Sequence, residues 1–139
     1  MHPLTRLHFD DLGKLLLRLS VGGLMLFHGI AKVRHGIDPI VHLVESKGLP
    51  SFVAYGAYLG EVIAPILILI GFLTRPAALI VGVNMGFAIW LVHMADLQRI
   101  TPQGAWGVEL QMFYLLGAIA LFFMGAGRFS VSRGKWAWD

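Results

Sequence analysis

Glu61 and Arg18 are charged residues that interrupt long apolar stretches of the sequence. Glu61 lies well inside the apolar run 52–73, and Arg18 lies in the run 12–32. If these runs cross a membrane, each charge costs at least about 2.5–3.5 kcal/mol in lipid and must turn inward to find a partner. We expect Arg18 to reach Glu61. Two interpretations stay open: a pair that only fixes helix register, or a Glu61 carboxylate that binds or relays protons beside a polar ligand.

A second set of polar residues lies toward the opposite ends of the apolar runs. His28 and Lys32 are four residues apart, so they share one face of a helix. The other members are expected at the same membrane level, and together they would form a polar pocket under an apolar roof, suited to a quinone head group or a similar small ligand. These other members are His93, Glu109 and Gln111.

Each of these residues also has an ordinary structural explanation. A single histidine such as His28 is often buried and hydrogen-bonded, and Lys32 could extend its amine to the interface. His93 and Gln111 could simply be solvated at the interface. Asn84, in the middle of the run 76–93, either joins the pocket or makes an interhelical hydrogen bond. The pocket is favoured because these residues are expected to converge with Glu109 at one membrane level.

The same residues do not predict a metal or haem site. Neither Glu61 nor Glu109 is followed three residues later by histidine, the spacing of di-iron four-helix bundles. There are no cysteines, so thiolate ligands and thiol redox chemistry are excluded. Haem ligation by His28 and His93 is disfavoured, and no phosphate-binding or nucleotide fingerprint is present.

The elements that must position these residues are four apolar segments. Of the 139 residues, 57% are hydrophobic and 14% charged, and the mean hydropathy is +0.73. Soluble domains are roughly 25% charged, whereas a spanning helix needs about 20 mostly apolar residues. Helices are favoured over a barrel because each satisfies its backbone groups internally. We predict one all-α membrane domain over residues 1–139, an antiparallel four-helix bundle with helices at about 12–32, 52–73, 76–93 and 106–124.

The connections and the glycines refine this prediction. Asp38 is placed to cap a short helix that starts at Pro39 and lies in the membrane interface. Small residues four apart allow helices to approach closely, within one chain or across a dimer; the pairs are Gly56 with Gly60 and Gly82 with Gly86.

Basic residues near the predicted helix ends favour cytoplasmic termini. Seven lie on the side of both termini and four on the other side, and cytoplasmic loops carry the excess of Lys and Arg. The seven are Arg6, Lys14, Arg18, Arg75, Arg128, Arg133 and Lys135, and the four are Lys32, Arg34, Lys47 and Arg99.

The order of several short motifs resembles the DoxX family of small bacterial membrane proteins. The motifs are Arg18 with the run GGLMLFHGIAK at 22–32, Gly60-Glu61, the run GFLTRPAA at 71–78, and Glu109 with the run GAGRFS at 125–130. The resemblance covers nearly the whole chain. It implies a four-helix subunit of the bacterial inner membrane that is linked to electron transfer, since relatives are described as parts of thiosulfate:quinone oxidoreductases or quinol oxidases.

The leading hypothesis is therefore a quinone-associated subunit of a membrane oxidoreductase complex. The protein would lie in the lipid bilayer, and its partner would be another membrane or periplasmic redox protein. A homo-oligomer stays open as an alternative, and nucleic acid is excluded as a partner. Glu61, His28 and Glu109 would pass protons. The quinone would be contacted by Arg18, Lys32, Asn84, His93 and Gln111.

Two other functions remain open. The family is also distantly similar to membrane chaperones and cargo receptors, which implies a non-enzymatic assembly factor or anchor. A small transporter subunit is the third possibility, with the intramembrane charges lining a path, and it would need an oligomer because four helices leave only a narrow route.

Overall fold

The computed structural model describes residues 3–139, with side chains from Phe9 onward, so the Arg6 side chain lies outside the described residues. Within that range the regular structure is helical, apart from one antiparallel bridge between Ile100 and Trp106. The elements are α1 (Pro3–Arg18), η1 (Leu19–Gly23), α2 (Leu24–His35), α3 (Asp38–Ser46), η2 (Ser51–Tyr55), α4 (Gly56–Tyr58), η3 (Leu59–Ile63), α5 (Ala64–Ile70), α6 (Thr74–Val92), η4 (Met94–Gln98) and α7 (Glu109–Met124).

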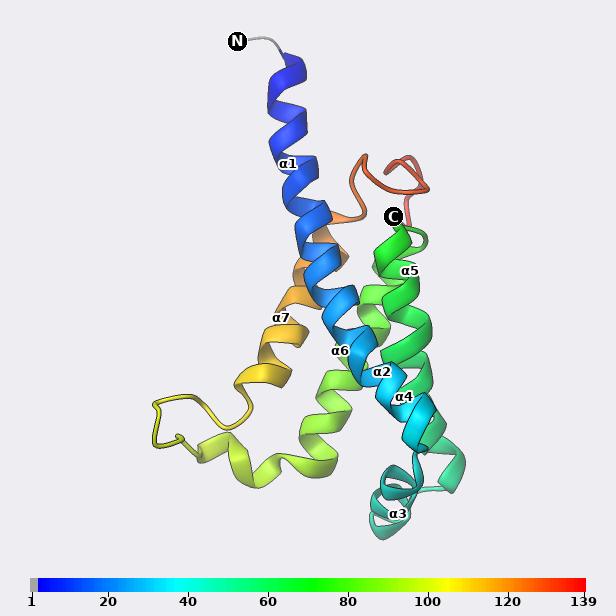
Figure 1. Cartoon of the computed structure of the whole chain (residues 1–139), viewed down its shortest axis with the longest axis vertical. Coiled ribbons are helices and arrows are strands. Elements are labelled where there is room, and N and C mark those ends of the chain that lie inside the picture. The colour runs from blue at the N-terminus through cyan, green and yellow to red at the C-terminus, as the bar shows by residue number, and fades with distance from the viewer. Residues whose placement is uncertain (1–2) are drawn as a thin grey trace.

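Both ends of the chain lie at one end of the molecule. Figure 1 shows α1 and the C-terminal segment at the top, and α3 with the connection between α6 and α7 at the bottom. The two helices α5 and α6 are joined by a tight turn at Gly71, which is left-handed with φ of 69°. The helices therefore alternate in direction, as the sequence predicts.

Three helical stretches of the described chain are long and apolar enough to cross a membrane. They are Phe9–His35, Ser51–Ile70 and Thr74–Val92. The fourth helix, α7, is apolar but has 16 residues, or about 24 Å at 1.5 Å per residue, against a hydrocarbon core of about 30 Å. All four predicted helices are present, and three of them have the length of a span.

Several helix ends differ from the prediction; among them, the first helical stretch ends at His35 and not at 32, and the third helix begins at Thr74 and not at 76. The first helix begins at Pro3 and not near residue 12, because the polar residues before the apolar run continue the helix. The second ends at Ile70 and not at 73, because Gly71 closes it in a left-handed conformation. The fourth begins at Glu109 and not at 106, because Trp106 pairs with Ile100 in the preceding loop.

Two of the long stretches pass through π-helical turns. One is η1, which starts directly after Arg18, and the other is η3, which contains Glu61. A π turn inserts an extra residue into a helix and is frequent at functional sites. Of the three buried charged residues in these stretches, Asp11, Arg18 and Glu61, the last two therefore lie next to or within an irregular turn.

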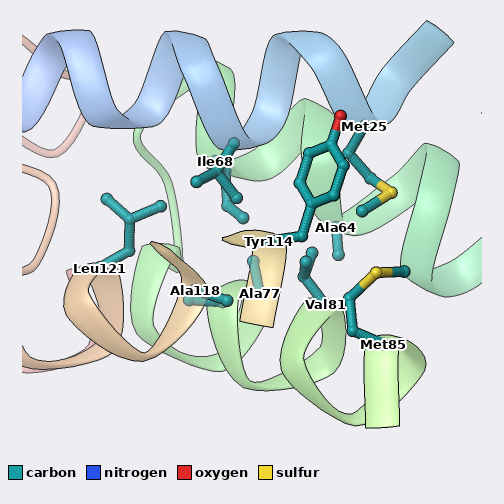
Figure 2. Close-up of a cluster of buried hydrophobic side chains, with 11 residues drawn as sticks. Met25, Ala64, Ile68, Ala77, Val81, Met85, Tyr114, Ala118 and Leu121 are labelled. Atoms are coloured by element: carbon teal, nitrogen blue, oxygen red, sulfur yellow. The ribbon is translucent and has the colours of Figure 1, made fainter. Parts of the chain in front are cut away.

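The main core fills the space between the long helices and α7. Figure 2 shows Met25 and Tyr114 packed with the side chains of α5 and α6, and the smaller Ala77 and Ala118 facing each other further along. These buried side chains include almost no polar atoms besides the Tyr114 hydroxyl, so this region is packed for contact between helices. The cluster comprises Val21, Met25, Ala64, Ile68, Ala77, Ala78, Val81, Met85, Tyr114, Ala118 and Leu121.

Glycines bring the helices closest around Glu61. A Cβ on Gly29 would overlap the backbone carbonyl of Glu61, and a Cβ on Gly60 would come within 2.5 Å of the Asn84 side chain. By contrast, a Cβ on Gly56 or Gly86 would meet nothing within 4 Å. Of each predicted glycine pair, only one member therefore packs against another helix, because the second member faces outward.

The short helix predicted between the first two spans is α3. Pro39 lies in its first turn as expected, but Asp38 is the first helical residue, and no side-chain cap bond is made. Its apolar face covers a second small core, because Val44 is fully buried beside Ala54 and Leu91. This packing holds α3 against η2 and the C-terminal part of α6.

Candidate functional site

Glu61 is the centre of the most polar buried cluster between the helices. The η3 turn places it near the middle of the stretch Ser51–Ile70, with its side chain about nine-tenths buried. The Lys32 ammonium group, reaching across from α2, forms an ion pair with Glu61 Oε2. The Asn84 amide, from α6, donates a hydrogen bond of 3.2 Å to Glu61 Oε1. Three helices therefore each contribute one polar group.

Lys32 and Asn84 keep hydrogen-bonding capacity beyond Glu61. An ammonium group carries three N–H donors, and a primary amide carries two donors and an acceptor oxygen. Among the described residues, the only hydrogen bond of each side chain is the one to Glu61. The cluster can therefore donate to an additional acceptor without losing its internal bonds.

A groove of about 520 Å³ opens beside this cluster. Lys32, Glu61 and Asn84 are the polar side chains on its wall, and the remainder is apolar. A concave apolar site with a few convergent polar groups is the usual form of a small-molecule site. The apolar lining comes from α3, from the start of the second helical stretch and from α6: Ile40, Leu43, Val44, Val53, Ala54, Gly56, Ala57, Leu59, Leu79, Ile80, Val83, Phe87, Ala88, Leu91 and Val92.

A second groove of about 370 Å³ lies between α6 and α7 and differs in chemistry. Gly82 and Ala118 lie on it, with Phe122 and Phe123 at one end, and its lining includes no polar side chain. It can hold lipid chains, but it cannot orient a polar group. The groove beside Glu61 is therefore the candidate site.

The predicted pair between Arg18 and Glu61 is wrong. Arg18 is fully buried, but its guanidinium group donates to four backbone carbonyls at the other end of the bundle. These are the carbonyls of Ile68 (2.8 Å), Leu69 (2.6 Å), Ala126 (3.0 Å) and Phe129 (2.6 Å). Carbonyls in the last turn of α5 and in the segment that follows α7 attract the cation, so Arg18 joins these two regions and does not line the groove.

The single polar pocket predicted at the outer end is divided into separate groups. His93 forms its own cluster, with Nδ1 2.9 Å from Asp96 Oδ2 and Nε2 3.0 Å from Gln111 Nε2. In the described part of the chain, no hydrogen bond joins this cluster to Lys32 or Glu61. The loop after α6 turns His93 toward α7 and away from the groove. His93 and Gln111 are therefore together, as predicted, but outside the candidate site.

His28 and Glu109 are also absent from the groove wall. His28 is exposed on α2, and its ring packs edge-on against Tyr114 with centroids 6.1 Å apart. Glu109 is exposed in the first turn of α7, where a negative charge favours the helix end. Of the residues singled out in the sequence, the structure gathers Lys32, Glu61 and Asn84.

Three neighbours of these residues were missed. Asp96 binds His93, and its position three residues later was a usable signal. The Tyr58 hydroxyl contacts the Lys32 carbonyl at 3.4 Å, and Tyr114 contacts His28. Neither tyrosine could be found from local spacing, because each lies on a different helix from its partner.

Comparison with known proteins agrees with this architecture. The model of the DoxX family matches residues 13–94, which include Lys32, Glu61 and Asn84. The chain belongs to the DoxX family. "Putative oxidoreductase CatD" of Bacillus subtilis is 32% identical over 116 residues, covering 84% of this chain and 81% of that protein.

Two further DoxX-like relatives have no activity in their names. An uncharacterized membrane protein of Mycobacterium tuberculosis is 32% identical over 126 residues, covering 84% of this chain and 77% of the relative. An uncharacterized protein of Haemophilus influenzae is 31% identical over 111 residues, covering 80% and 81%. No solved structure matches the chain. This DoxX protein is thus a multi-pass membrane protein whose chemistry must be argued from its own site.

Proposed function

We propose that this DoxX protein is a quinone-associated subunit of a membrane oxidoreductase complex. The observation that carries the proposal is the groove in which Lys32, Glu61 and Asn84 form the polar part of an otherwise apolar wall. A quinone has the matching shape, with two carbonyl oxygens on a ring and an apolar tail. The Bacillus subtilis relative, which is named "Putative oxidoreductase CatD", supports a redox role.

The polar cluster would hold and protonate the quinone oxygens. A spare N–H of the Lys32 ammonium group or of the Asn84 amide would donate to a carbonyl oxygen of the ring. Reduction of a quinone to a quinol consumes two electrons and two protons. Glu61, which touches both donors, is placed to pass protons to the site. The electrons would come from a partner redox protein or a soluble donor.

The membrane arrangement follows from the same proposal. We place α7 as the fourth span, completed by the segment 106–108 before it, and α3 in the outer interface. The start of α1 and the C-terminal segment, which lie toward the same end of the molecule in Figure 1, would face the cytoplasm of a bacterial inner membrane. The groove would then reach from the middle of the bilayer to its outer surface.

Purification in mild detergent from native membranes tests this function. The lipids extracted from the protein are analysed for quinone, and another multi-pass protein from the same membranes serves as the control. We expect quinone enriched over the control and close to stoichiometric with protein. A quinone content equal to that of the control would contradict the proposal.

A further inference from the structure

The groove beside Glu61 has a buried floor and an exposed rim. Val44 and Ala54 on its floor are almost fully buried, whereas Leu59 on η3 and Leu79 and Val83 on α6 are each more than two-fifths exposed. Leu79 and Val83 lie in the middle of a stretch that is long enough to cross the membrane. The rim therefore faces hydrocarbon, and the groove is open to it at that depth.

The groove is also much longer than its polar part. Along α6 its wall runs from Leu79 to Val92, which is about 20 Å at 1.5 Å per residue. Asn84 is the one polar residue along this part of the groove wall. Beyond it, Phe87, Ala88 and Leu91 continue the wall toward α3 as an apolar surface. A head group held at Glu61 and Asn84 would leave the wall from Asn84 to Val92, about 12 Å at 1.5 Å per residue, for an apolar tail.

Gly56 marks where a tail has room. It lines the groove at the start of α4, and a Cβ placed there would meet no protein atom within 4 Å. The space in front of Gly56 is therefore part of the groove and is not filled by a neighbouring helix. A large side chain at position 56 would occupy this space without displacing the protein.

We infer that the groove selects quinones with a long apolar tail, which enter from the bilayer between η3 and α6 and lay the tail past Gly56 beneath α3. This inference rests on the proposed quinone function. It adds that Gly56 and Leu79 determine specificity, whereas Lys32, Glu61 and Asn84 hold the head group. A water-soluble ligand would have no use for the lateral opening or for the apolar length.

Two probes separate the head-group site from the tail site. Purified protein in one detergent is titrated with a benzoquinone that has no tail and with the same head group bearing a decyl tail. We expect Gly56→Leu to weaken binding of the tailed quinone by at least about tenfold and to leave the tail-less quinone unchanged. Gly86→Leu is the matched control, because Gly86 is equally unobstructed but lies outside the groove lining.

A rim substitution keeps the test valid if Gly56→Leu fails to fold. Leu79→Trp should weaken binding of the tailed quinone, whereas Leu116→Trp should not, since Leu116 is equally exposed (58% against 57%) but lies on α7 away from the groove. Equal affinity of the two probes for the wild type, or tailed-quinone binding that neither Gly56→Leu nor Leu79→Trp weakens, would overturn the tail site while leaving the quinone function standing. Absence of saturable binding by either probe would overturn both.

Discussion

The Lys32 ammonium group on α2 and the Glu61 carboxylate on η3 form an ion pair inside the bundle. The pair is unequal in its surroundings, because the Lys32 side chain is 25% exposed and that of Glu61 is 9% exposed. In a nonpolar interior, each charge depends on the other for compensation.

Removal of one charge should destabilise the protein more than removal of both. Lys32→Met leaves the buried Glu61 carboxylate without its cation and should cost up to about 3 kcal/mol. The double variant Lys32→Met with Glu61→Leu leaves no orphan charge and should recover much of that loss. Thermal unfolding in detergent, analysed as a double-mutant cycle, measures both. Additive losses would show that the two groups are not coupled.

Gly29→Ala should be among the most damaging small substitutions in the chain. The added methyl group would overlap the carbonyl of Glu61, which is backbone and cannot move aside. We expect a loss above about 2 kcal/mol and a displaced Glu61. Gly56→Ala is the control, because its methyl group meets nothing within 4 Å; it should be neutral or slightly stabilising. Equal stability of the two variants would contradict the close approach of α2 and η3.

Arg18→Lys should loosen the end of the bundle that carries the termini. Arg18 donates to four carbonyls from two separate regions of the chain, and the single ammonium group of lysine cannot reach them all. We expect a loss of about 2–3 kcal/mol and faster proteolysis of the segment 125–139. Arg34→Lys, at an exposed site on α2, should change neither. An unaltered cleavage rate in Arg18→Lys would remove this structural role.

Gln111→Ala should affect the loop between α6 and α7 and not the groove. The Gln111 side chain links α7 to His93 at the end of α6 and contacts no groove residue by hydrogen bond within the described chain. We expect a cost of about 1 kcal/mol and faster cleavage within 94–108. Quinone affinity should remain at the wild-type value. A large loss of quinone affinity would return His93 and Gln111 to the binding site, as the sequence pattern suggested.

The sequence was sufficient for the helices but not for their polar partners. Apolar runs predicted the four helices and the short α3, because the length and position of an apolar run can be read directly from the sequence. A tight connection between the second and third helices was expected at 74–75, but it lies at 71–73, and Thr74 already begins α6. The partner of Glu61 was assigned incorrectly for two reasons. Lys32 was assigned to the outer polar pocket, with the interface as the alternative, although its long side chain reaches inward to Glu61. The π turns η1 and η3 change which face the following residues present, and no local pattern predicts them.

Arg18 illustrates why the sequence does not identify the partner of a buried charge. A buried arginine in an apolar run indicates a need for acceptors, and the sequence offered Glu61 as the obvious one. The actual acceptors are backbone carbonyls in the last turn of α5 and in the segment after α7, which the sequence cannot place beside α1. His93 and Gln111, in contrast, were correctly expected at one level, because both lie at the ends of neighbouring antiparallel helices.

The most direct test of the quinone function compares two glutamates. Purified wild-type protein, Glu61→Gln and Glu109→Gln are titrated with the same tailed quinone, since Glu61 lies on the groove wall and Glu109 is exposed on α7. Saturable wild-type binding that weakens at least about tenfold in Glu61→Gln and is unchanged in Glu109→Gln is the predicted result. Binding that is absent in the wild type, or equal in all three proteins, would contradict a quinone site at Glu61.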